Sequence, residues 1–353
     1  MLPLQSRGVV NVAQLRDFDE LIDVRSPAEF TEDHIPGAIN CPVLDDAERK
    51  RIGTIYKQVS SFEAKKIGAA LVARNISRHI EQIFITRQKN WRPLVYCWRG
   101  GNRSAAMAHV LEQVGWRAGR LKGGYKSYRA AVIEGLITLP KRFRFRVICG
   151  PTGSGKSRLI QTLDALGAQV LDLERLAAHR GSVLGGLPDE PQPAQKMFES
   201  LIWAKLHAFD AQEPVYVESE SKKIGNVRVP DVLLETMWHG QCVRIEADAS
   251  LRAAHLKEEY RHFLRDPETL LQKLEHLTSR YGHGAINSWK EYANYEQWDA
   301  LVLELLERHY DPAYNQSTLK HYPHYQDAPI LRVSTISDAE MRRLAQSIIS
   351  GNE

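Results

Sequence analysis

Hydrophobic and polar positions divide the chain into two successive parts, each with short apolar runs separated by longer amphipathic stretches. Short apolar runs between turn residues predict buried strands, and apolar residues three and four positions apart predict helices. Ser26, Pro27 and Glu29 mark a helix start, because they form a capping box with proline at the first helical position. In the first part we expect strands at 21–24, 36–41 and 93–97, and helices from 26, within 45–90, over 104–114 and after the glycine turn at 123–124.

The second part repeats this alternation, and strands that alternate with helices imply parallel sheets. Its expected strands are 145–149, 168–174, 213–221, 241–247 and 328–334, with long helical stretches over roughly 250–310. The sequence therefore predicts an α/β protein of two domains. The N-terminal domain is expected over 1–138, and the C-terminal domain over 139–353 with a helical insertion at about 250–310.

The polar segment LPKRFRFR, residues 139–146, joins the two parts. Its alternating Arg142, Arg144 and Arg146 indicate a linker that leads into a strand with one solvated face. A stripe of arginines that contacts RNA is the alternative interpretation.

Length and composition fit this organisation, since 353 residues with 43% hydrophobic and 25% charged side chains are typical of a globular protein with two domains. No apolar stretch approaches the roughly 18 residues that a membrane-spanning helix needs, and residues 1–10 lack the apolar core of a secretory signal. We therefore expect a cytoplasmic protein with no membrane partner. The net charge of +4 permits an anionic partner such as RNA.

The four cysteines are scattered without CxxC spacing, so neither a zinc site nor a disulfide framework is expected. Three of them are expected to be buried. The remaining one, Cys97, has a distinctive position in YCWRGGNRS, residues 96–104, where a strand is followed by a glycine loop and a helix.

Such a loop directs backbone N–H groups and the positive end of a helix dipole to one point, and Cys97 lies at that point. Arg99 and Arg103 add positive charge, so we expect a reactive thiolate beside a bound anion. An inert core cysteine at a strand end is the alternative. The other members of the predicted anion nest are Gly100, Gly101 and Ser104.

The second part begins with GPTGSGKS, residues 150–157, between a predicted strand and a predicted helix. This spacing is a P-loop, in which backbone N–H groups surround a phosphate chain, Lys156 reaches its terminal groups and Ser157 is placed to bind Mg²⁺. The residues expected to hold a phosphate or diphosphate group are Gly150, Gly153, Ser154, Gly155, Lys156 and Ser157.

Acidic residues at two strand ends are candidates to orient the magnesium ion through water, as a Walker B acid does. Asp172 ends one predicted strand, and Glu218 and Glu220 end another. Our predicted metal site consists of Ser157, Asp172 and Glu218, and the spacing does not choose between the acids.

Two basic segments are expected to be flexible loops that contact nucleic acid or another substrate. The first is HRGS, with His179 and Arg180, and the second is RYGHG, with Tyr281 and His283. Solvated surface loops with no ligand are the alternative interpretation.

Residues 10–138 resemble the rhodanese family. LIDVRSPAEFTEDHIPGAIN, residues 21–40, is similar to the first signature of that family, and YCWRGGNRS is similar to its active-site loop, whose cysteine carries a persulfide or selenide. The spacing from Cys97 to Arg103 is one residue longer than in typical rhodanese loops and equals that of the related dual-specificity phosphatases. We expect the longer loop to admit a tetrahedral anion.

The combination of this domain with GPTGSGKS and HRGS resembles the family of bacterial tRNA 2-selenouridine synthases over essentially the whole chain. The resemblance implies exchange of sulfur for selenium at C2 of the wobble 2-thiouridine in the tRNAs for lysine, glutamate and glutamine. It also implies selenophosphate as selenium donor, an S-selanylcysteine intermediate on Cys97, and geranyl diphosphate as the donor of an S-geranyl group. An enzyme that supplies selenophosphate is then an expected partner.

Other functions remain open from the residues alone. One is an ATP-dependent tRNA thiolase or kinase whose rhodanese-like domain carries sulfur. A second is a rhodanese-like phosphatase, which the longer loop permits. A third is a non-catalytic module that senses an anion and in which Cys97 is inert.

Overall fold

A computed structural model describes residues 8–351, and the chain within them forms two compact units that divide between Gly135 and Leu136. The expected boundary was 138/139. Residues 1–7, on which part of the expectation of no secretory signal depends, lie outside the described residues, as do 352–353. Among the described helices, none combines the length and apolar character needed to span a bilayer.

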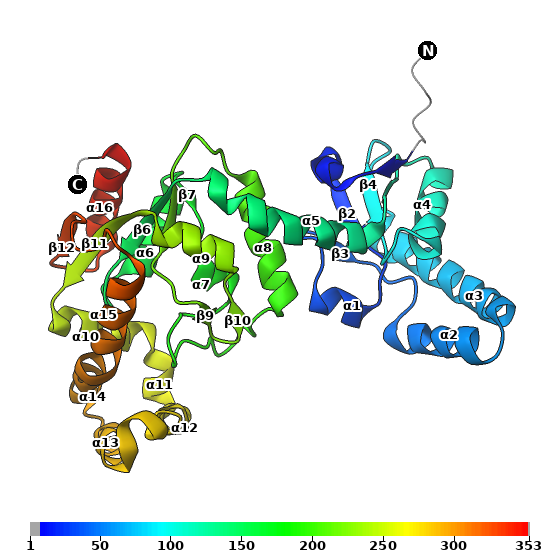
Figure 1. The fold of residues 1–353 in the computed structure, drawn as a ribbon. Helices are drawn as coiled ribbons and strands as arrows, with labels where there is room; N and C mark the ends of the chain where they lie inside the picture. Colours follow the sequence, from blue (N-terminus) through cyan, green and yellow to red (C-terminus); the bar gives the residue numbers. More distant parts are fainter. Residues whose placement is uncertain (1–7, 352–353) are drawn as a thin grey trace. The chain divides into compact units, whose positions relative to one another are not determined.

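The first unit contains a five-stranded parallel sheet with the order β1-β5-β4-β2-β3 (Figure 1). Its strands are β1 Val9–Val10, β2 Glu20–Asp23, β3 Ile39–Asn40, β4 Pro93–Tyr96 and β5 Gly119–Leu121. Its helices are η1 Val12–Asp17, α1 Pro27–Glu32, α2 Asp46–Gln58, α3 Ser61–His79, η2 Ile80–Phe84, α4 Asn102–Val114 and α5 Gly124–Thr138. The parallel α/β fold expected for this part is confirmed.

Local sequence explains where the key elements of this unit begin. The Ser26 N–H donates to Glu29 Oε2 at 3.2 Å, so the predicted capping box is present at the start of α1. All four residues of β4 are buried, as expected for an apolar strand with neighbours on both sides. The chain leaves the carboxyl end of β4 at Cys97 and enters α4 at Asn102, so the sheet fixes the position of the intervening loop.

The second unit contains a parallel sheet with the order β12-β11-β6-β8-β7 and a separate antiparallel pair, β9 and β10. Its strands are β6 Phe145–Cys149, β7 Gln169–Val170, β8 Val215–Glu218, β9 Lys223–Ile224, β10 Val227–Arg228, β11 Gln241–Ala247 and β12 Ile330–Val333. The helices around them are η3 Pro140–Arg142, α6 Lys156–Ala165, α7 Leu173–Leu176, α8 Gln195–Ala208, α9 Asp231–Trp238 and α16 Asp338–Ser350. The β6 strand is central, and its residue Ile148 pairs with Glu218 of β8.

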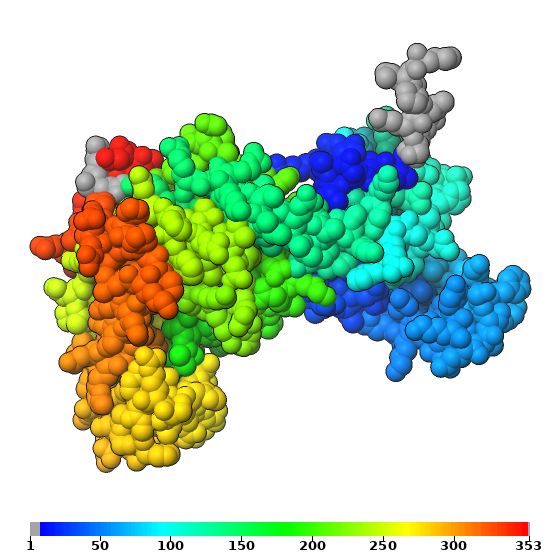
Figure 2. Space-filling view, viewed as in Figure 1, coloured from blue at the N-terminus to red at the C-terminus, as the bar shows by residue number. Residues whose placement is uncertain are grey.

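A helical region follows β11 and has a hydrophobic core of its own, which includes the fully buried Trp289. It extends the predicted insertion as far as His321 and appears in yellow to orange at the lower left of Figures 1 and 2. Its helices are α10 Ala249–Glu259, α11 Arg261–Arg265, α12 Pro267–Glu275, α13 Thr278–Asn294, α14 Trp298–Leu305, η4 Leu306–Tyr310 and α15 Asp311–His321.

The segment RYGHG is helical, so its prediction as a loop is wrong. It lies inside α13, which has a break at Gly282, where φ is 76° and ψ is 166°. Ile286 and Trp289 of the same helix are buried in the core of the helical region. Their burial outweighs the poor helix propensity of two nearby glycines, which misled the prediction from sequence.

Two of the three alternating arginines in the linker bond within the second unit. Arg144 donates from Nη2 to the Gln212 carbonyl at 2.5 Å, and Arg146 donates from Nη1 to the Ile348 carbonyl at 3.1 Å. These bonds support the interpretation as a linker that enters a strand.

Candidate functional site

The thiol of Cys97 lies at the floor of the loop that follows β4, and its residue is only 3% exposed. All four cysteines are therefore buried, one more than expected from sequence. Cys97 Sγ lies 3.2 Å from Ser104 Oγ, which also lies within hydrogen-bond distance, 3.1 Å, of the Gly101 carbonyl. A serine hydroxyl can turn its proton toward the sulfur, so Ser104 is placed to stabilise a thiolate.

The glycine start of α5 and its first turn hold this loop in place, a role that sequence reasoning missed. The Tyr125 N–H donates to the Cys97 carbonyl at 2.8 Å, and the Lys126 N–H donates to the Trp98 carbonyl at 3.0 Å. Gly124 has a φ of 60°, and a Cβ there would lie 2.5 Å from the Gly100 nitrogen and closer still to the Cys97 carbonyl. Only glycine permits this approach.

The two arginines of the loop have different surroundings. Arg103 is bound to Glu29 of α1, with Nη1 to Oε2 at 2.8 Å and Nη2 to Oε1 at 3.4 Å. Burial acts to raise the pKa of Glu29, but the hydrogen bond and charge of Arg103 outweigh it and lower that pKa below its usual value. Arg99 is exposed and has no ion pair among residues 8–351. Arg99 is thus the more available of the two charges.

A buried polar network supports the loop from below. Arg25 is 1% exposed, binds both oxygens of Asp23, and donates to the Asp33 carbonyl at 2.6 Å. The Tyr125 hydroxyl donates to Asp33 Oδ2 at 2.6 Å. The centre of its ring lies 4.0 Å from the Arg25 guanidinium carbon and 5.3 Å from the centre of the Trp98 ring. Because the network joins α1, β2 and α5, it fixes the loop to the sheet. The sequence showed Asp23, Arg25 and Asp33 only as parts of the first rhodanese signature, and it gave no sign that Tyr125 joins them.

The P-loop has the expected context, since residues 150–155 join β6 to α6. Gly153 and Gly155 have φ angles of 80° and 87°, which other residues rarely adopt. Lys156 Nζ donates to the Pro151 carbonyl at 3.2 Å, so the amine lies over the loop. The Gly150 N–H donates to the Tyr314 hydroxyl at 2.5 Å. The loop, lysine and helix N-terminus together form a cradle suited to phosphate groups.

Three carboxylates meet beside this cradle, and one of them was missed in the sequence. Glu174, Glu218 and Glu220 have oxygens that all lie within 4.8 Å of one another. Ser157 Oγ donates to Glu174 Oε2 at 3.1 Å. Asp172 instead caps α7 by accepting from the Arg175 N–H at 2.9 Å, and it is not a member of this group. Glu174 lies two residues after Asp172 in LDLE, residues 171–174, and nothing in that pattern shows which of the two acids joins the group.

The electrostatics of these carboxylates fit a divalent cation. Burial, followed by the charges of Glu218 and Glu220, raises the pKa of Glu174 well above its usual value. Burial also raises the pKa of Glu218 to about 7 and, together with the charge of Glu218, that of Glu220 to about 8. Neighbouring carboxylates that resist ionisation are stabilised as anions by a hard cation, and Ser157 offers a further oxygen ligand.

A large open cavity lies over the P-loop and contains the HRGS segment on its wall. Arg180 donates to the Glu259 carbonyl at 2.7 Å and stacks over Tyr260, whereas the buried His179 has an Nδ1 with no hydrogen-bond partner in the described chain. Tyr281 and His283 do not line this cavity. The Tyr281 hydroxyl is bonded to His309 at 2.8 Å, and His283 is exposed on α13.

The raised pKa values of Glu218 and Glu220 predict that the free energy of unfolding of the metal-free protein falls as the pH rises. Their raised pKa values in the folded state mean that the folded chain keeps protons that the unfolded chain releases above about pH 4.5. We expect the thermal midpoint of the second unit to fall from about pH 5 to about pH 8 and to recover on addition of Mg²⁺. Calorimetry measures this midpoint, and between the same pH values it should fall less in Glu220→Gln than in the wild type. A thermal midpoint that rises over this pH range would contradict the raised pKa values of these two carboxyl groups.

Comparison with known proteins assigns a protein family to each of the two units. The rhodanese-like domain family matches residues 10–131, and the tRNA 2-selenouridine synthase AAA domain family matches residues 143–276. The chain is 37% identical to the tRNA 2-selenouridine synthase of Hydrogenovibrio crunogenus over 255 residues, which are 68% of this chain and 67% of that protein. It is 34% identical to the synthase of Shewanella denitrificans over 280 residues, 78% of this chain and 72% of that one.

This chain belongs to the tRNA 2-selenouridine synthase family. It is also 37% identical to the family member of Nitrosomonas europaea over 244 residues, which are 68% of this chain and 63% of that protein, somewhat less than two thirds of its length. The resemblance to this family that the sequence motifs indicated is therefore confirmed, as is the rhodanese-like nature of the first unit. All three relatives are named as enzymes.

Proposed function

We propose that the chain converts wobble 2-thiouridine in tRNA to 2-selenouridine in two steps, geranylation of sulfur and its replacement by selenium. The observation that carries the proposal is that a member of this family combines a thiol in a glycine loop before a helix with a lysine-bearing P-loop beside three carboxylates. A thiol alone suits a sulfur carrier, and a cradle alone suits many phosphate ligands. Together they suit a reaction that needs both a chalcogen carrier and a diphosphate leaving group.

In the first step, the P-loop holds the diphosphate of geranyl diphosphate. The thiocarbonyl sulfur attacks C1 of the geranyl group, the C1–O bond breaks with its electron pair going to the diphosphate, and the base loses its N3 proton to solvent. Backbone N–H groups of the loop and the Lys156 amine stabilise the charge that develops on the departing diphosphate. This step consumes no ATP.

The oxygens of Ser157, Glu174, Glu218 and Glu220 would hold a magnesium ion beside the diphosphate. When bound, the ion supplies positive charge that offsets the negative charge of the leaving group. Lys156 and the carboxylates then have distinct tasks, since the lysine contacts phosphate oxygens and the carboxylates orient the cation.

In the second step, the Cys97 thiolate attacks the selenium of selenophosphate, and the Se–P bond breaks with its electron pair going to phosphorus. Phosphite leaves, and the cysteine carries the selenium as a selenenylsulfide. The selenium attacks C2 of the S-geranyl base, and geranyl thiol leaves. Two molecules of an external thiol supply the two electrons that cleave the S–Se bond, and they leave as a disulfide while the Cys97 thiolate and the C2 selenium are freed. S-alkylation assists this exchange because a thiol departs more readily than a thiocarbonyl sulfur. The tRNAs for lysine, glutamate and glutamine are the proposed substrates in the cytoplasm, and an enzyme that makes selenophosphate is the proposed supplier.

The test is to incubate the chain with tRNA that contains 2-thiouridine, geranyl diphosphate, selenophosphate, Mg²⁺ and a thiol, and to analyse the nucleosides by mass spectrometry. Formation of 2-selenouridine supports the proposal. Recovery of 2-thiouridine unchanged, from a protein whose circular dichroism is that of a folded chain, contradicts it.

Arg103→Ala is expected to weaken selenophosphate binding by roughly 1.5–3 kcal/mol, because it removes a charge-assisted hydrogen bond to the donor. Calorimetric titration with selenophosphate measures this. The control is Glu29→Gln, which keeps Arg103 and removes its anionic partner, and which should leave binding equal or stronger. Equal weakening by both variants would mean that the Arg103–Glu29 pair only supports the loop.

A further inference from the structure

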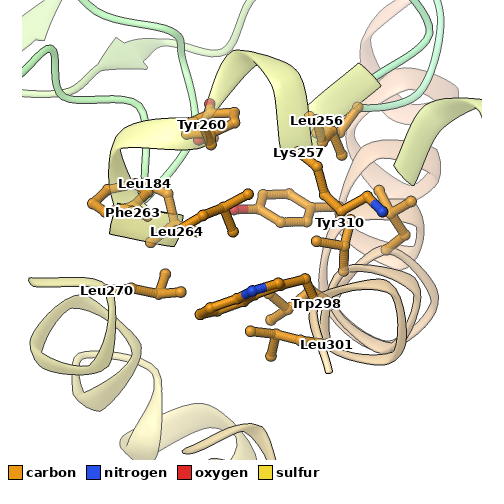
Figure 3. A pocket seen from close by; sticks show the side chains of 15 residues that line it. Leu184, Leu256, Lys257, Tyr260, Phe263, Leu264, Leu270, Trp298, Leu301 and Tyr310 are labelled. Carbon is orange, nitrogen blue, oxygen red and sulfur yellow. The ribbon is translucent and has the colours of Figure 1, made fainter. Parts of the chain in front are cut away.

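A second cavity lies in the second unit, within the helical region, and its walls are almost entirely apolar (Figure 3). Side chains from α10, α11, α12, α14 and η4 surround it, together with parts of the loops at 152 and 182–184. Figure 3 shows Leu264, Leu270, Trp298, Leu301 and Tyr310 directed toward one another around the space. Neither the sequence motifs nor the steps proposed above account for this cavity.

The apolar cavity adjoins the cavity over the P-loop. Five residues line both of them, and the first belongs to the P-loop itself: Thr152, Ser182, Leu256, Tyr260 and Tyr310. A ligand with phosphate groups at Lys156 therefore has an apolar space next to its other end.

The helical region is tied to the P-loop at this junction. Arg252 of α10 donates from Nε to the Thr152 carbonyl at 2.8 Å, and its other nitrogens bind the carboxylate of Asp311. Leu256, one turn later on α10, lies against the loop so closely that a Cβ at Gly153 would be 2.9 Å from its Cδ1. These contacts fix the mouth of the apolar cavity relative to the phosphate cradle.

The walls offer almost no hydrogen bonds to a ligand. The Lys257 amine is paired with Asp299 at 2.5 Å, and the Tyr260 hydroxyl lies 3.2 Å from Ser182 Oγ, so their polar groups already have partners. A nucleoside base and ribose would lose their hydrogen bonds to water here and gain few in return. A hydrocarbon chain has no hydrogen bonds to water to lose, and its transfer from water to an apolar pocket is favourable in free energy.

We propose that this pocket holds the hydrocarbon chain of the prenyl diphosphate and that Trp298 and Val302 of α14 set the chain length. The assignment rests on the proposed function and names the chain-binding part of its site. Tyr260 and Leu256 lie at the mouth, because they line both cavities, whereas Leu270, Trp298 and Leu301 lie on the opposite side in Figure 3. Residues on that side meet the end of the chain farthest from the diphosphate.

The test is a competition among dimethylallyl, geranyl and farnesyl diphosphates, with 2-thiouridine tRNA as acceptor and the thioether products resolved by mass. Trp298→Ala enlarges the side of the pocket opposite the mouth and should raise the ratio of farnesyl to geranyl product about tenfold. Val302→Phe fills the pocket from a half-buried position and should lower the ratio of geranyl to dimethylallyl product about tenfold. Leu303→Phe changes an exposed neighbour on the same helix and should leave all ratios unchanged.

A binding measurement separates this proposal from the proposed function. Val302→Phe should weaken calorimetric binding of geranyl diphosphate about tenfold and leave that of inorganic diphosphate unchanged. If the wild-type chain binds geranyl diphosphate with this dependence but does not prenylate tRNA, the proposed function fails and the pocket assignment stands. Product ratios and affinities that match the wild type in both pocket variants overturn the pocket assignment alone.

Discussion

Cys97→Ser is expected to abolish selenium transfer while leaving geranylation of the tRNA intact. The thiol lies in the loop of the first unit, where it contacts Ser104, whereas the residues of the phosphate cradle belong to the second unit. A serine hydroxyl is not ionised at neutral pH and does not take up selenium, so the loss should be complete. Tandem mass spectrometry of nucleosides should show S-geranyl-2-thiouridine accumulating and no 2-selenouridine.

The matched control for this variant is Cys41→Ala in the same unit. Cys41 is fully buried, and burial raises the pKa of its thiol to about 12, so it is protonated and unreactive at neutral pH. Its replacement should leave selenium transfer in place. If Cys97→Ser removed geranylation and selenation equally, from a chain with an unchanged thermal midpoint, the division of tasks between the units would be wrong.

Lys156→Ala is expected to remove geranylation, and with it the conversion of 2-thiouridine, by a factor of roughly 10² to 10³. The amine lies over the P-loop and is the cation of the loop best placed to meet the charge on a departing diphosphate. The same variant should still selenate tRNA that has been S-geranylated chemically, because that substrate has passed the step that needs the cradle. Removal of Mg²⁺ from the wild type should have the same two effects.

The pre-geranylated tRNA also provides the control, since its selenation shows that the variant is folded. Two results would contradict the role of the P-loop. One is failure of the Lys156 variant on both substrates alike. The other is a stoichiometric requirement for ATP, which would favour the nucleotide-dependent thiolase or kinase left open by the sequence.

Contiguous patterns allowed much of the fold and part of the site to be predicted. The apolar run before Cys97 and the glycines after it predict a strand, a loop and a helix, and β4 and α4 provide them. GPTGSGKS likewise predicts a preceding strand, the P-loop and a following helix, because the backbone conformation of this loop depends on residues that are adjacent in the sequence. Capping at Ser26 follows the same rule.

Contacts between distant segments could not be predicted in this way. Glu29 was recognised as a capping residue, but its ion pair with Arg103 depends on how α1 packs beside α4. Glu174 joins Glu218 and Glu220 because β7 and β8 are neighbours in the sheet, whereas the sequence placed Asp172 at that strand end. The apolar pocket is formed by helices whose residues, taken separately, resemble any hydrophobic core.

The most direct test of the account is nucleoside mass spectrometry on 2-thiouridine tRNA treated with the wild-type chain while each donor is omitted in turn. With geranyl diphosphate alone, we expect S-geranyl-2-thiouridine to accumulate. Later addition of selenophosphate and a thiol should convert it to 2-selenouridine, and selenophosphate without geranyl diphosphate should give no product. Formation of 2-selenouridine in the complete absence of geranyl diphosphate would contradict the two-step account.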